Sequence, residues 1–303
     1  MSIYINNFSI RVLETPTSLP LFSMESGKTL LSLRSDLSLF NSNASVILAD
    51  PFLFIWNNRL FLFYEHLKKW YGKGRICMRY TDDLINWSEE IEILNEPFHL
   101  SFPFVFEDDG AVYMIPETGE DHSISLYKAV DDSLAKWKRV KKLIEGEIPW
   151  YDSVVLKKGS SYYLFTGHDN LKCQTQHLFV SNNLLGPYKE HPMSPIYNGR
   201  DGGRNAGSII DHNGTYYRPV QMCIDSYGAQ VSIMQIKCIT PTDYQEGEYK
   251  KNILKESGPT YRYGGHQWNA VEFLGRRVIA TDYREKNYNL VELFRRIKRN
   301  CKK

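Results

Sequence analysis

The fold is decided by residues 49–65, which read Ala49-Asp50-Pro51-Phe52-Leu53-Phe54-Ile55-Trp56-Asn57-Asn58-Arg59-Leu60-Phe61-Leu62-Phe63-Tyr64-Glu65. Two short apolar runs, rich in aromatic side chains, flank the pair Asn57-Asn58, and such polar pairs favour tight turns. Asp50 stands at the start of the first run, and Glu65 ends the second. The stretch predicts a β-hairpin that carries a carboxylate at the open end of each strand.

The same hairpin pattern returns four more times along the chain. The repeats run over 102–117, 152–165, 207–219 and 268–282. If Asp50, Phe102, Asp152, Gly207 and Trp268 are taken as equivalent positions, the repeats are spaced by 50 to 61 residues. A hairpin in each period of this length is typical of a β-propeller, in which blades stack around an axis because one blade cannot bury both of its faces.

A second repeated pattern follows the first three hairpins. Each copy has a polar turn, then a Leu, then an aromatic residue that can fill the space between blades; the copies are Thr81–Trp87, Val130–Trp137 and Ser181–Tyr188. Together the two repeats predict an all-β fold, a five-bladed β-propeller. A β-sandwich whose strand spacing is coincidental is the alternative.

The composition limits the class of protein. The chain has 303 residues, 42% of them hydrophobic and 14% aromatic, which suits one large domain of packed sheets. A net charge of +2 gives no reason to expect nucleic acid as a partner. Five cysteines without a C-x-x-C spacing favour neither a disulfide framework nor a zinc site, and we expect no metal and no cofactor. With no signal peptide and no apolar run long enough to span a membrane, the sequence predicts a cytoplasmic protein.

The two ends of the chain differ from the repeats. Residues before about 45 are expected to donate a strand that closes the ring, so the propeller domain is predicted to span 1–285. In the tail, 286–303, four apolar residues at helical spacing stand among Arg and Lys: Leu290, Leu293, Phe294 and Ile297. This pattern predicts a short basic amphipathic C-terminal helix. It would pack on the outside of the propeller or make peripheral contact with an acidic surface such as the inner membrane, and disorder is the remaining alternative.

Equivalent positions of a propeller converge on one mouth of the axial channel. Asp50 and Asp152 are therefore expected to be neighbours, with Ser101 or Phe102 between them and their carboxyl groups within about 10 Å. Two carboxylates that face each other across a small pocket are the arrangement for glycosidic-bond chemistry, provided that their environments separate their pKa values. Each Asp has a plainer alternative, since Asp is a common turn residue, above all before Pro.

Further candidates lie on the neighbouring strand ends and loops. Substrate-binding roles are predicted for Glu65, Glu117, His168, Asn205, Gln221 and His266, besides Ser101. Arg200 and Arg204 stand in the Gly-rich loop 198–207, where a planar guanidinium suits a phosphate. No helix follows with phosphate-loop spacing, so this loop is no nucleotide-binding signature by itself. The alternatives are structural: strand ends, turns, a surface salt bridge for Arg204 and a hydrogen-bonding role for His266.

These residues carry a family resemblance. Ala49-Asp50-Pro51 before a strand and Thr81–Trp87 after the hairpin resemble the five-bladed arabinanase/β-xylosidase/invertase clan of glycoside hydrolases. Within that clan, three further stretches resemble the N-terminal domain of glucosamine inositolphosphorylceramide transferases and their bacterial relatives. They are 101–117, Arg204-Asn205-Ala206-Gly207, and Tyr217-Arg218-Pro219 with Gln221. The resemblance covers about residues 45 to 285.

The resemblance implies roles for single residues. Asp50 matches the clan's base or nucleophile, and Asp152 falls where the clan commonly has a general-acid Glu. Phe102 falls where the clan has a third carboxylate that tunes the acid. The loss of that carboxylate speaks against ordinary hydrolysis. A transferase with an activated donor needs less acid help, but it needs a cationic clamp for the departing diphosphate, for which Arg200 and Arg204 are the candidates.

Three functional hypotheses follow from these residues. The first is a glycosyltransferase that takes a sugar, such as a furanose, from a nucleotide-sugar donor and passes it to a glycan or lipid-linked glycan acceptor in the synthesis of a cell-surface polysaccharide or glycolipid. The second is a glycoside hydrolase of the furanosidase type. The third is a non-catalytic carbohydrate-binding propeller. The two acidic residues speak against the third hypothesis, and the missing third carboxylate speaks against the second.

Overall fold

The structure is a computed structural model that describes residues 4–36, 45–68, 72–169, 173–223 and 226–288. In this part of the chain the regular structure is almost entirely β, with three short 3-10 turns, Gly119–Asp121, Lys255–Ser257 and Pro259–Tyr261. The predicted C-terminal helix falls on residues 289–303, which lie outside the described residues. Strand β21 (Arg276–Tyr288) continues three residues past the expected domain boundary at 285.

The described strands form four sheets, one of which has eight strands joined by a parallel contact between β1 and β3. Divided at that contact, the strands make five antiparallel units, which we call blades I to V. Blade I contains β3 (Ser45–Trp56), β4 (Arg59–Lys68), β5 (Arg75–Thr81) and β6 (Ile91–Leu94). Blade II contains β7 (Ser101–Asp108), β8 (Ala111–Glu117), β9 (Ser123–Ala129) and β10 (Trp137–Glu145). Blade III contains β11 (Tyr151–Lys158), β12 (Ser161–Asp169), β13 (Gln174–Ser181), β14 (Lys189–Glu190) and β15 (Tyr197–Gly199).

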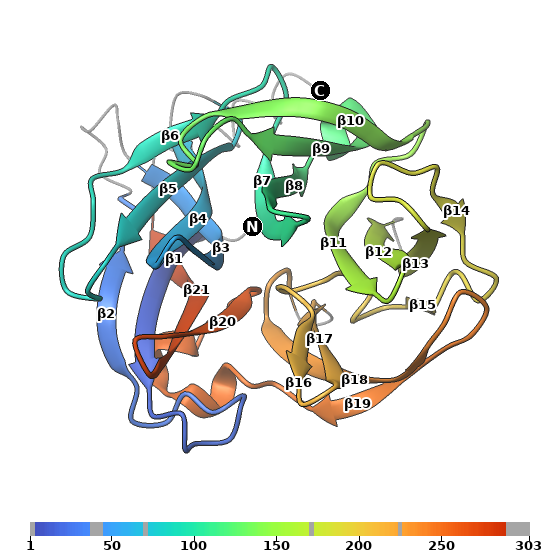
Figure 1. The fold of residues 1–303 in the computed structure, drawn as a ribbon. Coiled ribbons are helices and arrows are strands. Elements are labelled where there is room, and N and C mark those ends of the chain that lie inside the picture. The colour runs from blue at the N-terminus through green and yellow to red at the C-terminus, as the bar shows by residue number, and fades with distance from the viewer. Residues whose placement is uncertain (1–3, 37–44, 69–71, 170–172, 224–225, 289–303) are drawn as a thin grey trace, which may run out of the picture.

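Blade IV contains β16 (Ile210–His212), β17 (Thr215–Met222), β18 (Gln230–Ile239) and β19 (Tyr244–Lys250). Blade V combines β20 (Trp268–Phe273) and β21 with β1 (Tyr4–Thr15) and β2 (Lys28–Leu33). The blades surround an axis, with β3, β7, β11, β16 and β20 innermost and β2, β6, β10 and β19 at the rim (Figure 1). This arrangement confirms the predicted propeller.

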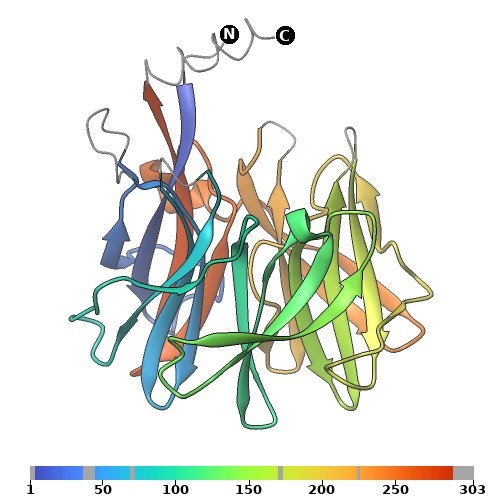
Figure 2. The ribbon, with the colours of Figure 1, turned by 90° about the horizontal axis from the view of Figure 1, so that it is seen from above.

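The ring is closed by pairing the two ends of the chain. β1 pairs with β21 over its whole length, from Tyr4 opposite Tyr288 to Thr15 opposite Arg277, and β2 adds to the outer edge of β1. The segment before residue 45 thus donates two strands where one was expected. The β1–β21 pair also extends beyond the other blades on one side of the ring (Figure 2).

Two outer parts of the blades differ from the sequence-based boundaries. Blade III was expected to end near Pro187, but β14 and β15 both pair with β13, so the blade continues to Gly199. The stretch after Pro241 was interpreted as a polar connection, yet it contains β19, which pairs with β18. Short, polar edge strands carry little hydrophobic periodicity, which is why the sequence pattern did not reveal them.

The repeated turns fill the spaces between blades as their sequence predicted. Leu84, Leu134 and Leu184 are all buried, and the aromatic residues after them pack on the same core clusters. In the first turn Thr81 Oγ1 accepts hydrogen bonds from two backbone N–H groups, of which that of Leu84 lies at 3.0 Å. Polar side chains thus satisfy the turn backbone while its Leu points into the core.

Apolar contact between blades forms the core. One large cluster joins blades I to IV, a second joins blade I to blade V, and a third joins blades IV and V. The third cluster depends on Gly207, since a Cβ at this position would lie 2.0 Å from the carbonyl oxygen of Trp268. Blades IV and V therefore approach each other at backbone distance beside the axis.

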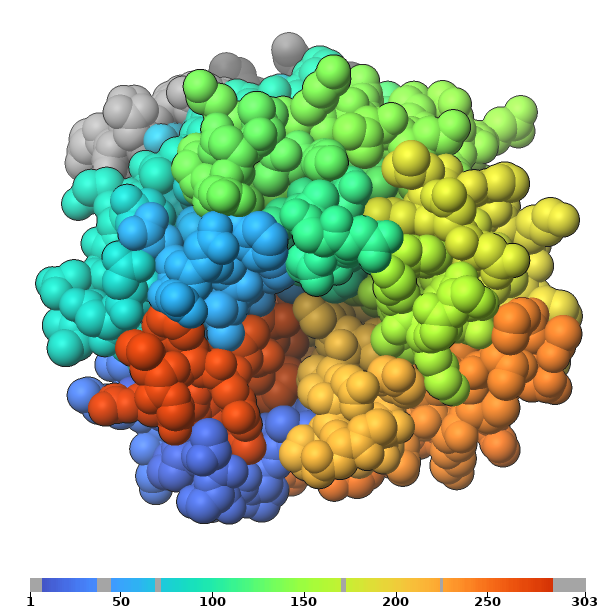
Figure 3. Space-filling view, viewed as in Figure 1, coloured from blue at the N-terminus to red at the C-terminus, as the bar shows by residue number. Residues whose placement is uncertain are grey.

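One face of the ring carries the inner hairpin turns and is hollowed at its centre (Figure 3). The opposite face carries the starts of the inner strands, and we call this side the mouth. Within the described residues no helix is long and apolar enough to cross a membrane. The four cysteines in this part of the chain form no disulfide bond with one another.

Candidate active site

The backbone turns functional side chains toward the axis at equivalent points of three blades. Asp50, Phe102 and Asp152 have positive φ angles of 52°, 44° and 50°. At each of them the register between the first and second strand of the blade shifts. A bulge of this kind adds a residue to one strand and re-aims its side chain. The three positions that are equivalent in the sequence repeat therefore also share the same backbone geometry.

Asp50 is buried at the mouth, and its neighbours determine its charge. Its Oδ2 accepts a hydrogen bond from the backbone N–H of Phe102 at 3.1 Å, which ties blade I to blade II. Burial raises the pKa of Asp50, and the nearby charges of Asp152 and Asp282 add to this effect, while His266 opposes it; the resulting pKa is about 7. Asp50 and Asp152 are thus close enough to influence each other electrostatically, and Asp50 can exchange a proton near neutral pH.

His266 lies between two carboxylates. Its Nδ1 is 2.5 Å from Asp282 Oδ2, and its Nε2 is 3.7 Å from Asp50 Oδ1. Burial alone would lower the pKa of His266, but the charges of Asp282 and Asp50 outweigh burial and raise it to about 9. His266 is therefore a cation at neutral pH. The ring of Phe8 stacks on it at 4.4 Å between centroids.

Asp282 was not among the residues predicted from the sequence. It is fully buried, and it accepts hydrogen bonds from the backbone N–H groups of His266 and Gln267 at 2.7 and 3.1 Å. The repeat contained the signal, because Asp282 is the last residue of the fifth hairpin repeat, 268–282, as Glu65 and Glu117 are the last residues of the first two repeats. Its neighbour Thr281 pairs with Trp268, the equivalent position of blade V.

Arg204 is the centre of an ion network in the wall of the site. Its Nε donates to Asp152 Oδ2 at 2.6 Å and its Nη2 donates to Glu117 Oε2 at 3.2 Å. Asp169 Oδ2 lies 3.6 Å from Nη1, and the guanidinium stacks over the ring of Tyr151 at 4.7 Å. Arg204 is thus already neutralised by carboxylates of the protein.

A glycine makes room for this arginine. The residue opposite the start of the bulge is Glu65 in blade I, Glu117 in blade II and Gly167 in blade III. A Cβ at Gly167 would lie 3.2 Å from Arg204 Cγ. Blade III therefore has no carboxylate at this position, and the side chain of Arg204 lies where that carboxylate would be.

Two glutamates, Glu65 and Glu117, lie opposite the starts of the bulges in blades I and II. Burial raises the pKa of Glu65 well above its usual range, and the charge of Asp50 adds to it. Burial and the charge of Asp152 also raise the pKa of Glu117, although Arg204 opposes them. His99 Nε2 lies 3.4 Å from Glu65 Oε1. The environments of Glu65 and Glu117 thus favour the protonated carboxyl group, which is the form that a general acid needs.

Two amides fix the position of Asp152. Gln221 Nε2 donates to its Oδ2 at 2.8 Å, and Asn205 Nδ2 donates to its backbone carbonyl at 2.7 Å. Ser101 is buried opposite Glu117, beside the bulge of blade II. The structure therefore gathers most of the predicted residues around the mouth: Asp50, Glu65, Ser101, Glu117, Asp152, Arg204, Asn205, Gln221 and His266.

His168 and Arg200 lie outside this cluster. His168 donates from Nδ1 to the carbonyl oxygen of Pro149 at 3.0 Å and contacts the ring of Trp150. Arg200 is exposed, and within the described residues it forms no ion pair. Both follow Gly-containing stretches in the sequence, where spacing does not determine the direction of a side chain.

Two groups of side chains have donor atoms close enough to share a metal ion. One is Asp50, His266 and Asp282 at the mouth, and the other is His66, Cys77 and Glu90 in blade I. In the first group the raised pKa of His266 keeps a proton on the ring, and a metal ion would have to displace it. In the second, His66 already contacts Glu90 at 2.9 Å, and burial raises the pKa of Cys77 far above its usual range. Contacts within the protein therefore occupy both groups: ion pairs of His266 in the first, and hydrogen bonds of His66 in the second.

Comparison with known sequences identifies relatives. The family model "Glucosamine inositolphosphorylceramide transferase 1, N-terminal" matches residues 35–275. Glucosamine inositolphosphorylceramide transferase 1 of Arabidopsis thaliana is 33% identical over 234 residues, which cover 75% of this chain and 30% of the plant protein. The protein of that name from Oryza sativa subsp. japonica is 32% identical over 236 residues, 76% of this chain and 31% of the relative. The chain thus spans about a third of the length of these relatives.

Solved structures share the fold at low sequence identity. A family 117 glycoside hydrolase of Zobellia galactanivorans is similar with a TM-score of 0.55 and 12% identity, over 91% of this chain and 90% of the other. A thermostable family-43 glycoside hydrolase is similar with a TM-score of 0.57 and 15% identity, over 80% of this chain and 86% of the other. These likenesses agree with the predicted resemblance to the glycoside hydrolase clan and concern the fold alone.

Proposed function

Because the chain belongs to the family of the N-terminal domain of glucosamine inositolphosphorylceramide transferase 1, we propose that its carboxylate cluster binds a sugar and transfers it. The product would be a cell-surface polysaccharide or a glycolipid. The donor in this proposal is a nucleotide sugar, with a furanose among the candidates, and the acceptor is a glycan or lipid-linked glycan. The observation that carries the proposal is Asp50, a buried carboxylate at the mouth whose pKa is about 7.

Asp50 is the base in this proposal. A general base works best when its pKa lies near the working pH, and burial has brought Asp50 there. The acceptor hydroxyl gives its proton to Asp50 while its oxygen forms the new bond to the anomeric carbon. The bond from that carbon to the diphosphate breaks, and the diphosphate leaves with the electron pair. The N–H of Phe102 and the imidazolium of His266 hold the carboxylate in place during this step.

Glu117 supplies the acid where one is needed. Burial raises its pKa well above the usual range, which favours the protonated carboxyl group that an acid needs. Asp152 lies beside it and is held by hydrogen bonds from Arg204 and Gln221, so in this proposal Asp152 positions these groups. The resemblance implies a general acid at the position of Asp152. In this proposal Glu117, one blade earlier, takes that role.

Glycoside hydrolysis of the furanosidase type is the second candidate. The observation in its favour is the same pair of carboxyl groups, Asp50 and Glu117, whose raised pKa values suit hydrolysis if one acts as base, the other as acid and water replaces the acceptor. Phe102 weighs against it, because its buried side chain occupies the equivalent position in blade II and offers no third carboxylate.

The geometry of blade V supports an acceptor at a membrane. β21 runs six residues past Asp282, so its end stands about 20 Å beyond the carboxylates on the mouth side (Figure 2). The basic segment 289–303 follows in sequence. In this proposal the protein works in the cytoplasm, in peripheral contact with the inner membrane through that segment, and the mouth is turned toward a lipid-linked acceptor.

The experiment is a pair of turnover assays on the wild type and on Asp50→Asn. One measures release of nucleoside diphosphate from nucleotide sugars in the presence of glycan and glycolipid acceptors; the other measures hydrolysis of aryl furanosides. We expect Asp50→Asn to slow transfer by about 10²–10⁴-fold, the usual contribution of a general base, with little change in melting temperature. Full activity in this variant would remove Asp50 from the mechanism. Turnover of furanosides alone would establish the hydrolase instead.

A further inference from the structure

A second pocket opens beside the mouth, between blades IV and V. It has a volume of about 540 Å³ and is lined by Ser226, by Ala229, by Gln230 of β18, by Lys255 and residues 258, 259 and 261–264, and by Arg284 of β21. Three cationic side chains line it, Lys255, Arg262 and Arg284, and none of the described lining residues is acidic. Its charge is therefore opposite to that of the carboxylate cluster.

Arg284 provides the fixed part of this charge. It is buried, and its three hydrogen bonds go to neutral oxygens: the carbonyl of Tyr263 at 2.6 Å, the carbonyl of Tyr227 at 2.8 Å and Ser226 Oγ at 2.9 Å. These bonds use three of the five N–H donors of a guanidinium. A buried arginine held only by neutral groups keeps its full positive charge for a ligand, unlike Arg204.

Lys255 and Arg262 add two positive charges to the pocket. Both are exposed, and neither forms an ion pair with an acidic residue of the described chain. The guanidinium of Arg262 rests on the ring of Tyr263 at 4.5 Å, which leaves its edges open for hydrogen bonds. Arginine suits phosphate because its planar fork can bind two oxygens at once.

The pocket continues the carboxylate cluster along one strand. Asp282 and Arg284 alternate with Tyr283 on β21, so they share a face of the strand about 7 Å apart. Tyr227 connects the two sites as well, since its ring packs edge-on against His266 and its carbonyl binds Arg284. A sugar held by the carboxylates can therefore reach this pocket with a phosphate group attached to it.

We propose that this pocket binds the phosphate or diphosphate group of the substrate, a role that the sequence suggested for Arg200 and Arg204. The inference rests on the proposed function, in which the sugar lies among the carboxylates. The network around Arg204 has more carboxylates than cations and repels an anion, whereas the pocket of Lys255, Arg262 and Arg284 attracts one. The same chemistry would serve the diphosphate of a nucleotide sugar or the phosphate of a lipid headgroup.

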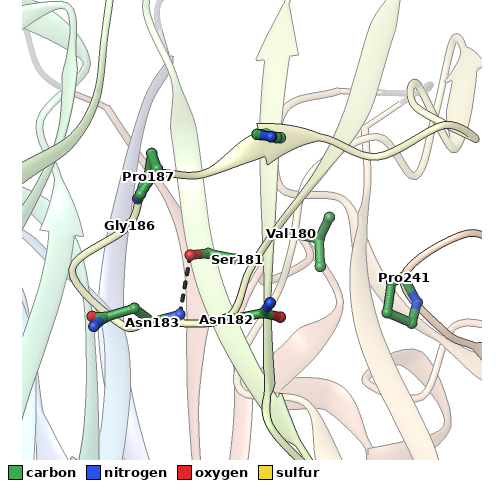
Figure 4. A pocket seen from close by; sticks show the side chains of 8 residues that line it. Val180, Ser181, Asn182, Asn183, Gly186, Pro187 and Pro241 are labelled. Atoms are coloured by element: carbon green, nitrogen blue, oxygen red, sulfur yellow. Dashed lines mark hydrogen bonds between the residues drawn. The ribbon is translucent and has the colours of Figure 1, made fainter.

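The test is a set of calorimetric titrations with inorganic pyrophosphate and uridine diphosphate, and a flotation assay with phosphatidylcholine vesicles that contain or lack phosphatidylinositol. The test variant is Lys255→Gln combined with Arg262→Gln, because both side chains are exposed and the fold should survive. Lys189→Gln is the control: it removes one exposed charge from another pocket, of about 390 Å³, which is lined by residues of blade III and by Pro241 (Figure 4).

We expect the wild type to bind pyrophosphate, and the double variant to bind it at least about tenfold more weakly. Lys189→Gln should bind like the wild type. Binding of uridine diphosphate without vesicle binding assigns the pocket to the donor, and phosphatidylinositol-dependent flotation that the double variant loses assigns it to a lipid phosphate. If no probe binds, or if the double variant binds as tightly as the wild type, the inference is overturned. The titrations need no turnover, so a failed transfer assay would leave their result standing.

Discussion

Removing the cation of Arg204 should destabilise the protein in a pH-dependent way. Arg204→Met keeps most of the side-chain volume but leaves Asp152 and Glu117 buried without their shared partner. Two hydrogen bonds to charged groups are worth about 1.5–3 kcal/mol each, and breaking a buried ion pair costs about 3–5 kcal/mol. We expect the free energy of unfolding to fall by about 3–5 kcal/mol at neutral pH.

The pH dependence follows from the sign of the shift at Glu117. Burial already raises the pKa of this group in the folded protein, and Arg204 is what opposes the rise. Without Arg204 the pKa of folded Glu117 rises further above the unfolded value. Such a group favours the folded state at low pH and loses that contribution as the pH rises through the folded pKa. The deficit of the variant should therefore shrink in acid.

The assay is urea unfolding followed by tryptophan fluorescence at about pH 8 and about pH 5. Arg59→Met is the control, because Arg59 makes a two-pronged contact with Asp82 at the surface, and such exposed pairs contribute little. A deficit for Arg204→Met below about 1 kcal/mol, or one equal at both pH values, would refute the reasoning. It would mean that the carboxylates around Arg204 are solvated or find other partners.

Three further predictions concern the backbone and the base. The value of kcat/KM for transfer should rise with pH through about 7 as Asp50 loses its proton, and a flat pH profile would contradict its role as base. Gly207→Ala should lower the free energy of unfolding by about 2 kcal/mol or more, because the new Cβ would meet the Trp268 carbonyl. Gly214→Ala, which also has a positive φ but open space around it, should cost clearly less in the same unfolding assay. Phe102→Asp should cost about 3–5 kcal/mol, since it empties a core position and buries a carboxylate; a stable variant would show that the carboxylate finds partners there.

Sequence spacing predicted the parts of the site that repeat. Asp50 and Asp152 could be placed at one mouth because every blade presents the same backbone position to the axis. The bulges with positive φ confirm that equivalence at Asp50, Phe102 and Asp152. Asp282 could have been found by the same argument, since it ends its hairpin as Glu65 does.

The parts that do not repeat could not be predicted. Arg204 packs against Gly167 because blade III has no side chain at this position. The spacing of the repeats does not reveal which blade has the glycine. Arg204 was expected to be open to phosphate, yet three carboxylates from blades II and III surround it. A charged residue in a loop can be recognised from sequence, but its partners come from other blades and appear only when the ring is closed.

The distribution of charge in the site depends on one position of the repeat, at which the residue differs from blade to blade. The hairpin repeats of blades I, II and V end in Glu65, Glu117 and Asp282, while Gly167 takes the place of the glutamate in blade III. Three carboxylates around one axis would repel one another if all were ionised, and burial together with this repulsion raises the pKa of Glu65 and Glu117. Such a cluster can hydrogen-bond the hydroxyl groups of a sugar but cannot hold a phosphate. If the substrate carries one, the cations that bind it must lie away from the axis, and the pocket of Arg284 offers three cations that form no ion pair with an acidic residue of the described chain.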